Sequence, residues 1–124
     1  MIKADLAQRI EWIEAGYEYL LAYAAQGRRD DTGSDARRML TQMQTALDGL
    51  GAEVGRAFAG SARESAAFFE AVAQDARVAS GAIALVLDRA SISSLLVDNL
   101  NASVHLRALL TDLFLIDQAL KTAD

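Results

Sequence analysis

The chain has 124 residues, a formal net charge of −5, and neither proline nor cysteine. Its length suits one domain, residues 1–124. The lack of cysteine excludes disulfides, thiolate metal sites and thiol catalysis. The acidic charge opposes binding to the phosphate backbone of nucleic acids. Four arginines (28, 29, 37 and 38) form a local basic cluster, but the aspartates between them largely cancel it. We therefore expect no nucleic-acid partner.

The composition indicates an all-α fold. Hydrophobic residues make up 52% of the chain, and many of them are alanine, the strongest helix former. Proline, which breaks helices, is absent, and no run alternates β-branched residues as strands do. The most apolar stretch, residues 78–87, is about half as long as a membrane span. With no secretory signal at the N-terminus, the sequence predicts a cytoplasmic protein that does not enter a membrane.

The first helix is expected over residues 4–26, with a heptad seam of apolar side chains between Leu6 and Ala24. Gly27 ends it, and residues 28–34 form a loop with Ser34 as N-cap of the next helix. The second helix, residues 35–59, carries one apolar face.

A third helix is expected from residue 61 to about residue 90. It begins with a capping box in which the Ser61 side chain and the Glu64 side chain each bond to the other residue's backbone. Gly81 allows a break midway, which would raise the number of helices from four to five.

Serines at 91–94 favour a turn or a cap before the last helix, which runs to about residue 122. Its early and late apolar residues lie on different sides, so it is either buried nearly all round or kinked between Asn99 and Ser103. Four helices with short connections predict an antiparallel four-helix bundle.

An aromatic stripe on the first helix is the main candidate site. Trp12, Tyr19 and Tyr23 share one side, away from the heptad seam, and Gly16 leaves a notch between them. Tryptophan and tyrosine are enriched at interface hot spots, so the stripe predicts a partner surface. Two alternatives remain open: the bundle wraps both faces with the hydroxyls at its wet edge, or the rings line a small-molecule pocket.

Three glycines in the second helix are the other candidate. Each glycine inside a helix costs about 1 kcal/mol relative to alanine. Gly51 and Gly55 lie four residues apart opposite the apolar face, a spacing that lets another backbone approach closely. The alternative is that residues 48–51, which include Gly49, form a turn that splits the helix.

The polar residues do not assemble into a catalytic set. His105 is the only histidine, and its position indicates a solvated polar face. The alternative is a phosphoacceptor in a phosphotransfer module, but the lysine and glycine expected soon after such a histidine are missing. Glu11, Glu14 and Glu18 form an acidic ridge, which we expect to be solvated. Di-metal bundles need Glu-x-x-His pairs that this chain lacks, so no metal or cofactor is expected.

The sequence thus predicts a non-enzymatic helical-bundle interaction protein. It is expected to self-associate or bind a protein partner through the Trp12, Tyr19 and Tyr23 side of the first helix and the Gly51 and Gly55 side of the second. The alternative is a ligand-sensing bundle with a small apolar or aromatic molecule in its core, and a less favoured one is phosphotransfer through His105.

Overall fold

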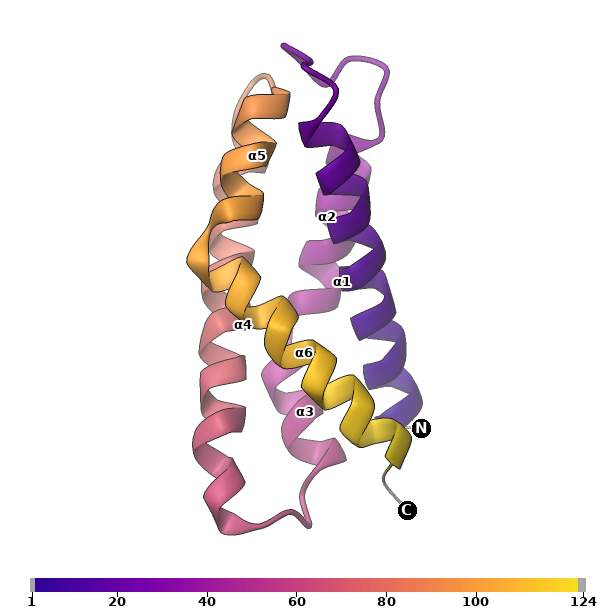
Figure 1. The fold of residues 1–124 in the computed structure, drawn as a ribbon, viewed down its shortest axis with the longest axis vertical. Coiled ribbons are helices and arrows are strands. Elements are labelled where there is room, and N and C mark those ends of the chain that lie inside the picture. The colour runs from indigo at the N-terminus through magenta and orange to yellow at the C-terminus, as the bar shows by residue number, and fades with distance from the viewer. Residues whose placement is uncertain (1, 123–124) are drawn as a thin grey trace.

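The computed structural model describes residues 2–122, in which all regular structure is helical (Figure 1). The all-α prediction is confirmed. The predicted count of four or five helices is wrong, because the described chain has six α-helices and one short 3-10 helix, Arg63–Ser65. The α-helices are α1 (Ile2–Ala24), α2 (Ala36–Leu47), α3 (Leu50–Ala57), α4 (Ala66–Leu87), α5 (Ser94–Ala102) and α6 (Val104–Thr122).

The second expected helix is two helices. Gly49 has a φ of 74°, a left-handed conformation that glycine adopts without the steric cost of a Cβ atom. This residue ends the run of α2 and stands just before α3. The alternative that a turn splits the helix is confirmed, but the turn comprises only Asp48 and Gly49, because Leu50 and Gly51 already belong to α3. The single helix over residues 35–59 is wrong.

The last expected helix also divides. Ser103 has extended backbone angles, φ −61° and ψ 137°, between α5 and α6. The predicted kink is confirmed, and burial on all sides is not needed because each piece turns its own apolar face inward. The alternative of a break near Gly81 does not occur, since α4 continues from Ala66 to Leu87.

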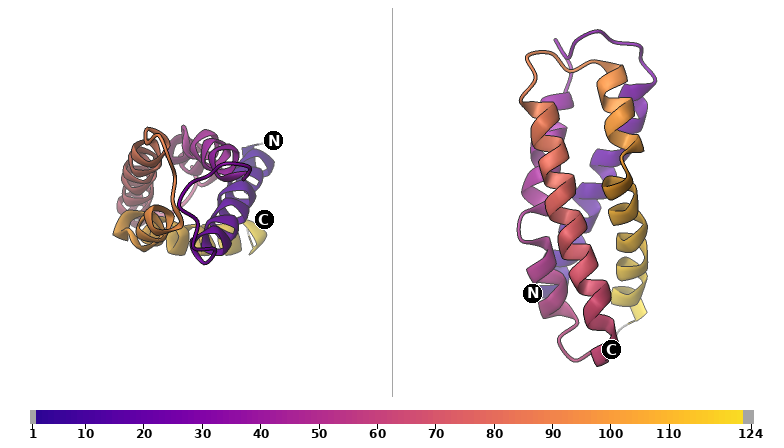
Figure 2. Two further views of the ribbon diagram at one scale, coloured as in Figure 1. Left: turned by 90° about the horizontal axis from the view of Figure 1, so that it is seen from above. Right: turned by 90° about the vertical axis from the view of Figure 1, so that its left-hand side faces the viewer.

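The helices alternate in direction (Figure 1). From the end where the N-terminus lies, α1 runs to the far end, α2 and α3 return, α4 runs out again, and α5 and α6 come back. The two longest helices, α1 and α4, each contact all of α2, α3, α5 and α6. The view from above in Figure 2 shows the same helices along the length of the molecule. Helix α6 crosses obliquely from α4 toward the first turns of α1. No helix of the described chain is both long and apolar enough to span a bilayer.

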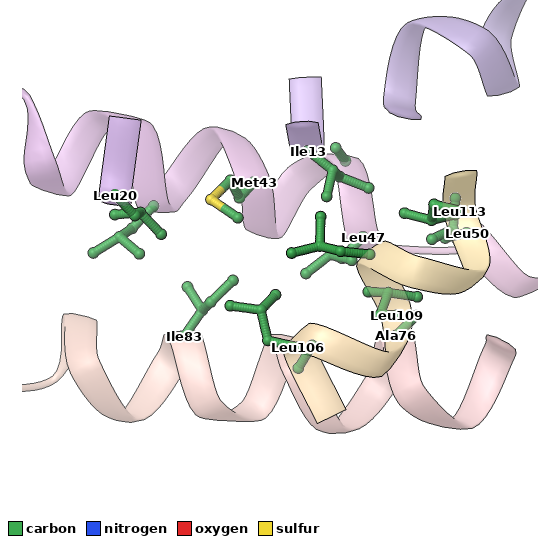
Figure 3. Packing of buried hydrophobic residues seen from close by; sticks show 14 of the residues in the cluster. Ile13, Leu20, Met43, Leu47, Leu50, Ala76, Ile83, Leu106, Leu109 and Leu113 are labelled. Carbon is green, nitrogen blue, oxygen red and sulfur yellow. The ribbon is translucent and has the colours of Figure 1, made fainter. Parts of the chain in front are cut away.

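The core runs the length of this arrangement. The α1 seam supplies Leu6, Ile10, Ile13 and Leu20, each at most 1% exposed. Figure 3 shows side chains from α1, α2, α3, α4 and α6 converging in its middle. Those labelled there are Ile13, Leu20, Met43, Leu47, Leu50, Ala76, Ile83, Leu106, Leu109 and Leu113. Removing these apolar surfaces from water is the main stabilising contribution to the fold.

The serines at helix starts differ in what they bind. The predicted capping box is wrong: the 3-10 helix intervenes after residue 62, and α4 begins at Ala66 without a side-chain cap. The Ser34 hydroxyl accepts a hydrogen bond from the Ala36 N–H at 3.3 Å, at the start of α2. Ser93 caps α5, because its hydroxyl accepts from the Leu96 N–H at 3.0 Å.

Candidate functional site

The aromatic stripe of α1 does not form one exposed surface. Trp12 is 37% exposed, but Tyr19 is partly buried and Tyr23 is fully buried. The Tyr23 hydroxyl donates to the Ile92 carbonyl at 2.6 Å, and the Tyr19 hydroxyl accepts from the Asp35 N–H at 3.1 Å. The expectation that all three face a partner is therefore wrong for Tyr23. Its ring belongs to the core, whereas Trp12 and part of Tyr19 remain accessible.

The glycines are tightly packed at two positions and free at one. A Cβ atom on Gly16 would overlap the Met43 side chain of α2, so the notch in α1 is filled from within the chain. A Cβ on Gly51 would overlap the Cβ of Ala73 and lie 3.0 Å from its Cα, so α3 packs closely on α4 there. A Cβ on Gly55 would meet nothing within 4 Å. The predicted close approach is correct for Gly51 and wrong for Gly55.

A hydrogen-bonded cluster that the sequence did not predict joins two loops at one end of the molecule. Asp31 accepts from the Ile92 N–H at 2.9 Å and from Arg37 Nε at 2.8 Å. Arg37 also donates to the carbonyls of Leu87, Arg89 and Ala90, where α4 ends. The guanidinium thus binds free carbonyls at the negative end of the α4 dipole.

Two further residues extend this cluster into the core. The Ser94 hydroxyl donates to the Tyr23 carbonyl at 2.7 Å and accepts from the Arg28 N–H at 2.8 Å. The Ser94 N–H donates to the Arg28 carbonyl at 2.9 Å. We call this set the clasp; its members are Tyr23, Arg28, Asp31, Arg37, Ile92 and Ser94. In the sequence, the loop aspartates and Arg37 indicated only that their charges cancel. They did not indicate that Asp31 bonds to Arg37 and to Ile92.

Asp31 is the ionisable centre of the clasp. The hydrogen bond from the Ile92 N–H lowers the pKa of Asp31 below its ordinary value, and the bond from Arg37 adds to this effect. Burial acts in the opposite direction and is outweighed. The carboxylate is therefore held in its charged form, which suits a structural role.

His105 lies at the side of α6 that faces α4. Its Nδ1 is 3.1 Å from Asp75 Oδ1, and its side chain is about half exposed. Burial, and then the charge of Asp75, raise the pKa of the neighbouring Asp112. Within the described residues, no group of three or more histidine and carboxylate side chains is placed to hold a metal. The pair is a polar contact between α4 and α6.

The acidic ridge of α1 is only partly solvated. Burial raises the pKa of Glu14, and the charges of Asp117 on α6 and of Glu18 and Glu11 add to it, while Lys121 opposes them. Glu14 therefore lies beside α6 rather than wholly in water.

The outer side of α6 carries a second apolar row. Val104 is 71% exposed and Leu115 is 61% exposed, on the side opposite the buried leucines of the same helix. The row continues at helical spacing through uncharged residues only: Val104, Ala108, Thr111, Leu115, Ala119 and Thr122. A helix of a globular domain needs one apolar face, and this helix has two.

An aromatic depression lies near the lower end of α6. It has a volume of about 290 Å³ and is walled by Phe58, Phe68 and Phe69 on one side and by Leu115, Ile116 and Ala119 on the other; Ser61 and Ser65 complete the lining. The Phe58 and Phe69 rings stack with centroids 5.6 Å apart, and Phe68 lies 5.9 Å from Phe69. We call this the phenylalanine depression. The adjacent pair Phe68 and Phe69 was its only sequence signal.

No protein-family model, curated protein or solved structure matches the chain.

Proposed function

We propose that the chain is a non-enzymatic interaction protein that associates with a second copy of itself through the outer row of α6. This surface replaces the aromatic stripe of α1, because Tyr23 is buried and the Tyr19 hydroxyl is hydrogen-bonded to the N–H of Asp35, the residue before α2. The observation that carries the proposal is the exposure of Val104 and Leu115 in a row free of charge. Exposed apolar rows of this kind mark interaction sites.

The row is complementary to itself about its midpoint. In an antiparallel pair with a two-fold axis near residue 113, Thr111 of one copy faces Leu115 of the other. Ala108 faces Ala119, and Val104 faces Thr122. A larger side chain thus meets a smaller one at the centre, and two small residues meet on each side, which lets the helices approach closely. Two-fold symmetry is the commonest arrangement of homo-oligomers.

The proposed architecture supports this use of α6. We interpret α2 with α3, and α5 with α6, as two interrupted helices of an antiparallel four-helix bundle. In that scheme α6 is an outer helix with one side in the core and the other toward the second copy. A different protein occupying the same row is the alternative partner.

The test is the mass in solution, measured by light scattering over a range of protein concentrations. We expect a dimer that Leu115→Glu and Val104→Glu each convert to a monomer, because either change places a charge in the outer row of α6. The matched control is Leu85→Glu, since Leu85 is 62% exposed on α4 and lies outside the row. Helicity by circular dichroism should be the same for all three variants. A wild-type protein that stays monomeric at the highest concentrations would contradict self-association.

A further inference from the structure

The phenylalanine depression is a concave site whose walls come from three separate parts of the chain. Phe58 follows α3, Phe68 and Phe69 belong to the first turn of α4, and Leu115, Ile116 and Ala119 belong to α6. The site therefore lies toward the end of the molecule at which α3 connects to α4, the lower end in Figure 1. None of the three phenylalanines is fully buried, so the rings are accessible at the wall of the site.

The lining determines the charge of a suitable occupant. It contains six apolar side chains and two serines, and no lysine, arginine, histidine or carboxylate. Transfer of an unpaired charge into such surroundings costs far more than transfer of a neutral group. The site therefore favours an uncharged molecule, and the phenylalanine rings favour a flat aromatic one that stacks on them.

The size of the depression favours a small molecule over a helix of another protein. A volume of about 290 Å³ is at the lower end of the range of small-molecule sites, roughly 300–1,000 Å³. Along α6 the lining extends only from Leu115 to Ala119, little more than one turn. A docked helix needs anchor points over two or more turns, whereas a molecule of two fused rings fits within one.

The two serines supply hydrogen bonding at the rim. Neither the Ser61 hydroxyl nor the Ser65 hydroxyl forms a hydrogen bond among the side chains that the structure describes, although both residues precede helix α4. Their side chains do not cap that helix, so both hydroxyls are free to bond to a ligand.

We infer that the phenylalanine depression binds a small, uncharged aromatic molecule that carries one hydroxyl or similar hydrogen-bonding group. The aromatic rings of this molecule lie between the phenylalanines and Leu115, and its polar group bonds to Ser61 or Ser65 at the rim. This site lies at the surface near the end of the bundle and not in the centre of the core. Leu115 and Ala119 also belong to the outer row, so the site is open in the monomer, and the proposed dimer would compete with the ligand for these two side chains. Val104 takes no part in the site.

The test compares three probes by NMR titration of the full chain: 2-naphthol, naphthalene and naphthalene-2-sulfonate. We expect saturable shifts for 2-naphthol at Phe58, Phe68, Phe69 and Ala119, weaker binding of naphthalene, and no binding of the sulfonate. The double variant Ser61→Ala with Ser65→Ala should weaken 2-naphthol several-fold and leave naphthalene unchanged. A sulfonate that binds as tightly as 2-naphthol would overturn the inference.

Filling the site gives the matched pair of variants. Ala119→Leu extends into the depression and should abolish 2-naphthol binding, whereas Ala108→Leu lies in the same row of α6 outside the depression and should leave binding intact. Val104→Glu should disrupt the proposed dimer without touching the depression, so it should not weaken 2-naphthol binding. This result separates the inference from the proposed dimer. Shifts that persist in Ala119→Leu, or that never saturate in the wild type, would show that the depression is not a binding site. Thermal melting of each variant confirms that the fold is retained.

Discussion

The two ends of the molecule connect their helices by different physical means. At one end, the loop between α1 and α2 and the loop between α4 and α5 are joined by the clasp, with Asp31, Arg37 and Ser94 bonding across them. At the other end, a single connection joins α3 to α4, and half-buried phenylalanines line a depression beside it. Directional hydrogen bonds fix the geometry of the first end. Apolar contacts, which have no preferred direction, leave the second end able to accept another molecule.

The largest expected effect is at the clasped end. Tyr23→Ala removes a fully buried ring and should lower the free energy of unfolding by about 3–5 kcal/mol. Tyr23→Phe keeps the ring and removes only the hydroxyl that donates to the Ile92 carbonyl, so about 1–2 kcal/mol should be lost. Urea denaturation measures both. A Tyr23→Ala variant as stable as wild type would show that the clasp does not depend on this ring.

Asp31→Asn tests the charge within the clasp. The pKa of Asp31 is lowered in the folded state, so its contribution is fully present above its ordinary value of 3.8 and is lost as the pH falls through the folded pKa. The variant should therefore be less stable by about 1–2 kcal/mol at neutral pH. The difference should shrink as the pH falls through the lowered pKa of folded Asp31, because the carboxyl then becomes neutral like the asparagine.

Stability curves for wild type and Asp31→Asn across this pH range provide the measurement. If the loss of stability in Asp31→Asn is the same at neutral and acid pH, the charge of Asp31 does not contribute, and the change in hydrogen-bonding geometry accounts for the loss. Asp35→Asn is the control, because Asp35 is exposed and pairs only with Arg38 at 3.4 Å.

Two glycines of α3 test how closely the helices pack between the two ends. Gly51→Ala should destabilise by roughly 1–3 kcal/mol, because its Cβ would overlap Ala73 on α4. Gly55→Ala should stabilise by roughly 0.5–1 kcal/mol, because the added Cβ meets nothing and alanine favours helix. Thermal melting of the two variants should shift in opposite directions. Equal shifts would contradict the close packing at Gly51.

The smallest expected effect compares a serine from each end. Ser93→Ala should cost about 1 kcal/mol, since the hydroxyl caps the first turn of α5. Ser65→Ala occupies the equivalent position before α4 but should leave the denaturation midpoint unchanged, because its side chain makes no cap bond. A loss of stability in Ser65→Ala would show that the apolar end also relies on hydrogen bonds.

The sequence by itself determined the all-α class and the apolar seam of α1. These are local properties: alanine content and the absence of proline favour helix, and the spacing of Leu6, Ile10, Ile13 and Leu20 follows the helical repeat. Gly49 and Ser103 were already marked as sites of a turn or a kink. Most of the buried residues of α1 could be predicted in this way. The number of helices could not, because the choice between a continuous and a divided helix depends on what packs against it.

Only the tertiary structure decided which of the candidate surfaces are exposed. Tyr23 and Gly16 look available on an isolated helix, but Ile92 and Met43, which approach from distant parts of the chain, bury them. The clasp pairs residues about sixty positions apart, such as Asp31 with Ile92, and no local pattern encodes that pairing. The outer row of α6 and the phenylalanine depression could not be predicted for the same reason: both depend on contacts between distant parts of the chain. A helical wheel shows which residues share a side, and the packing of the other helices determines which side meets water.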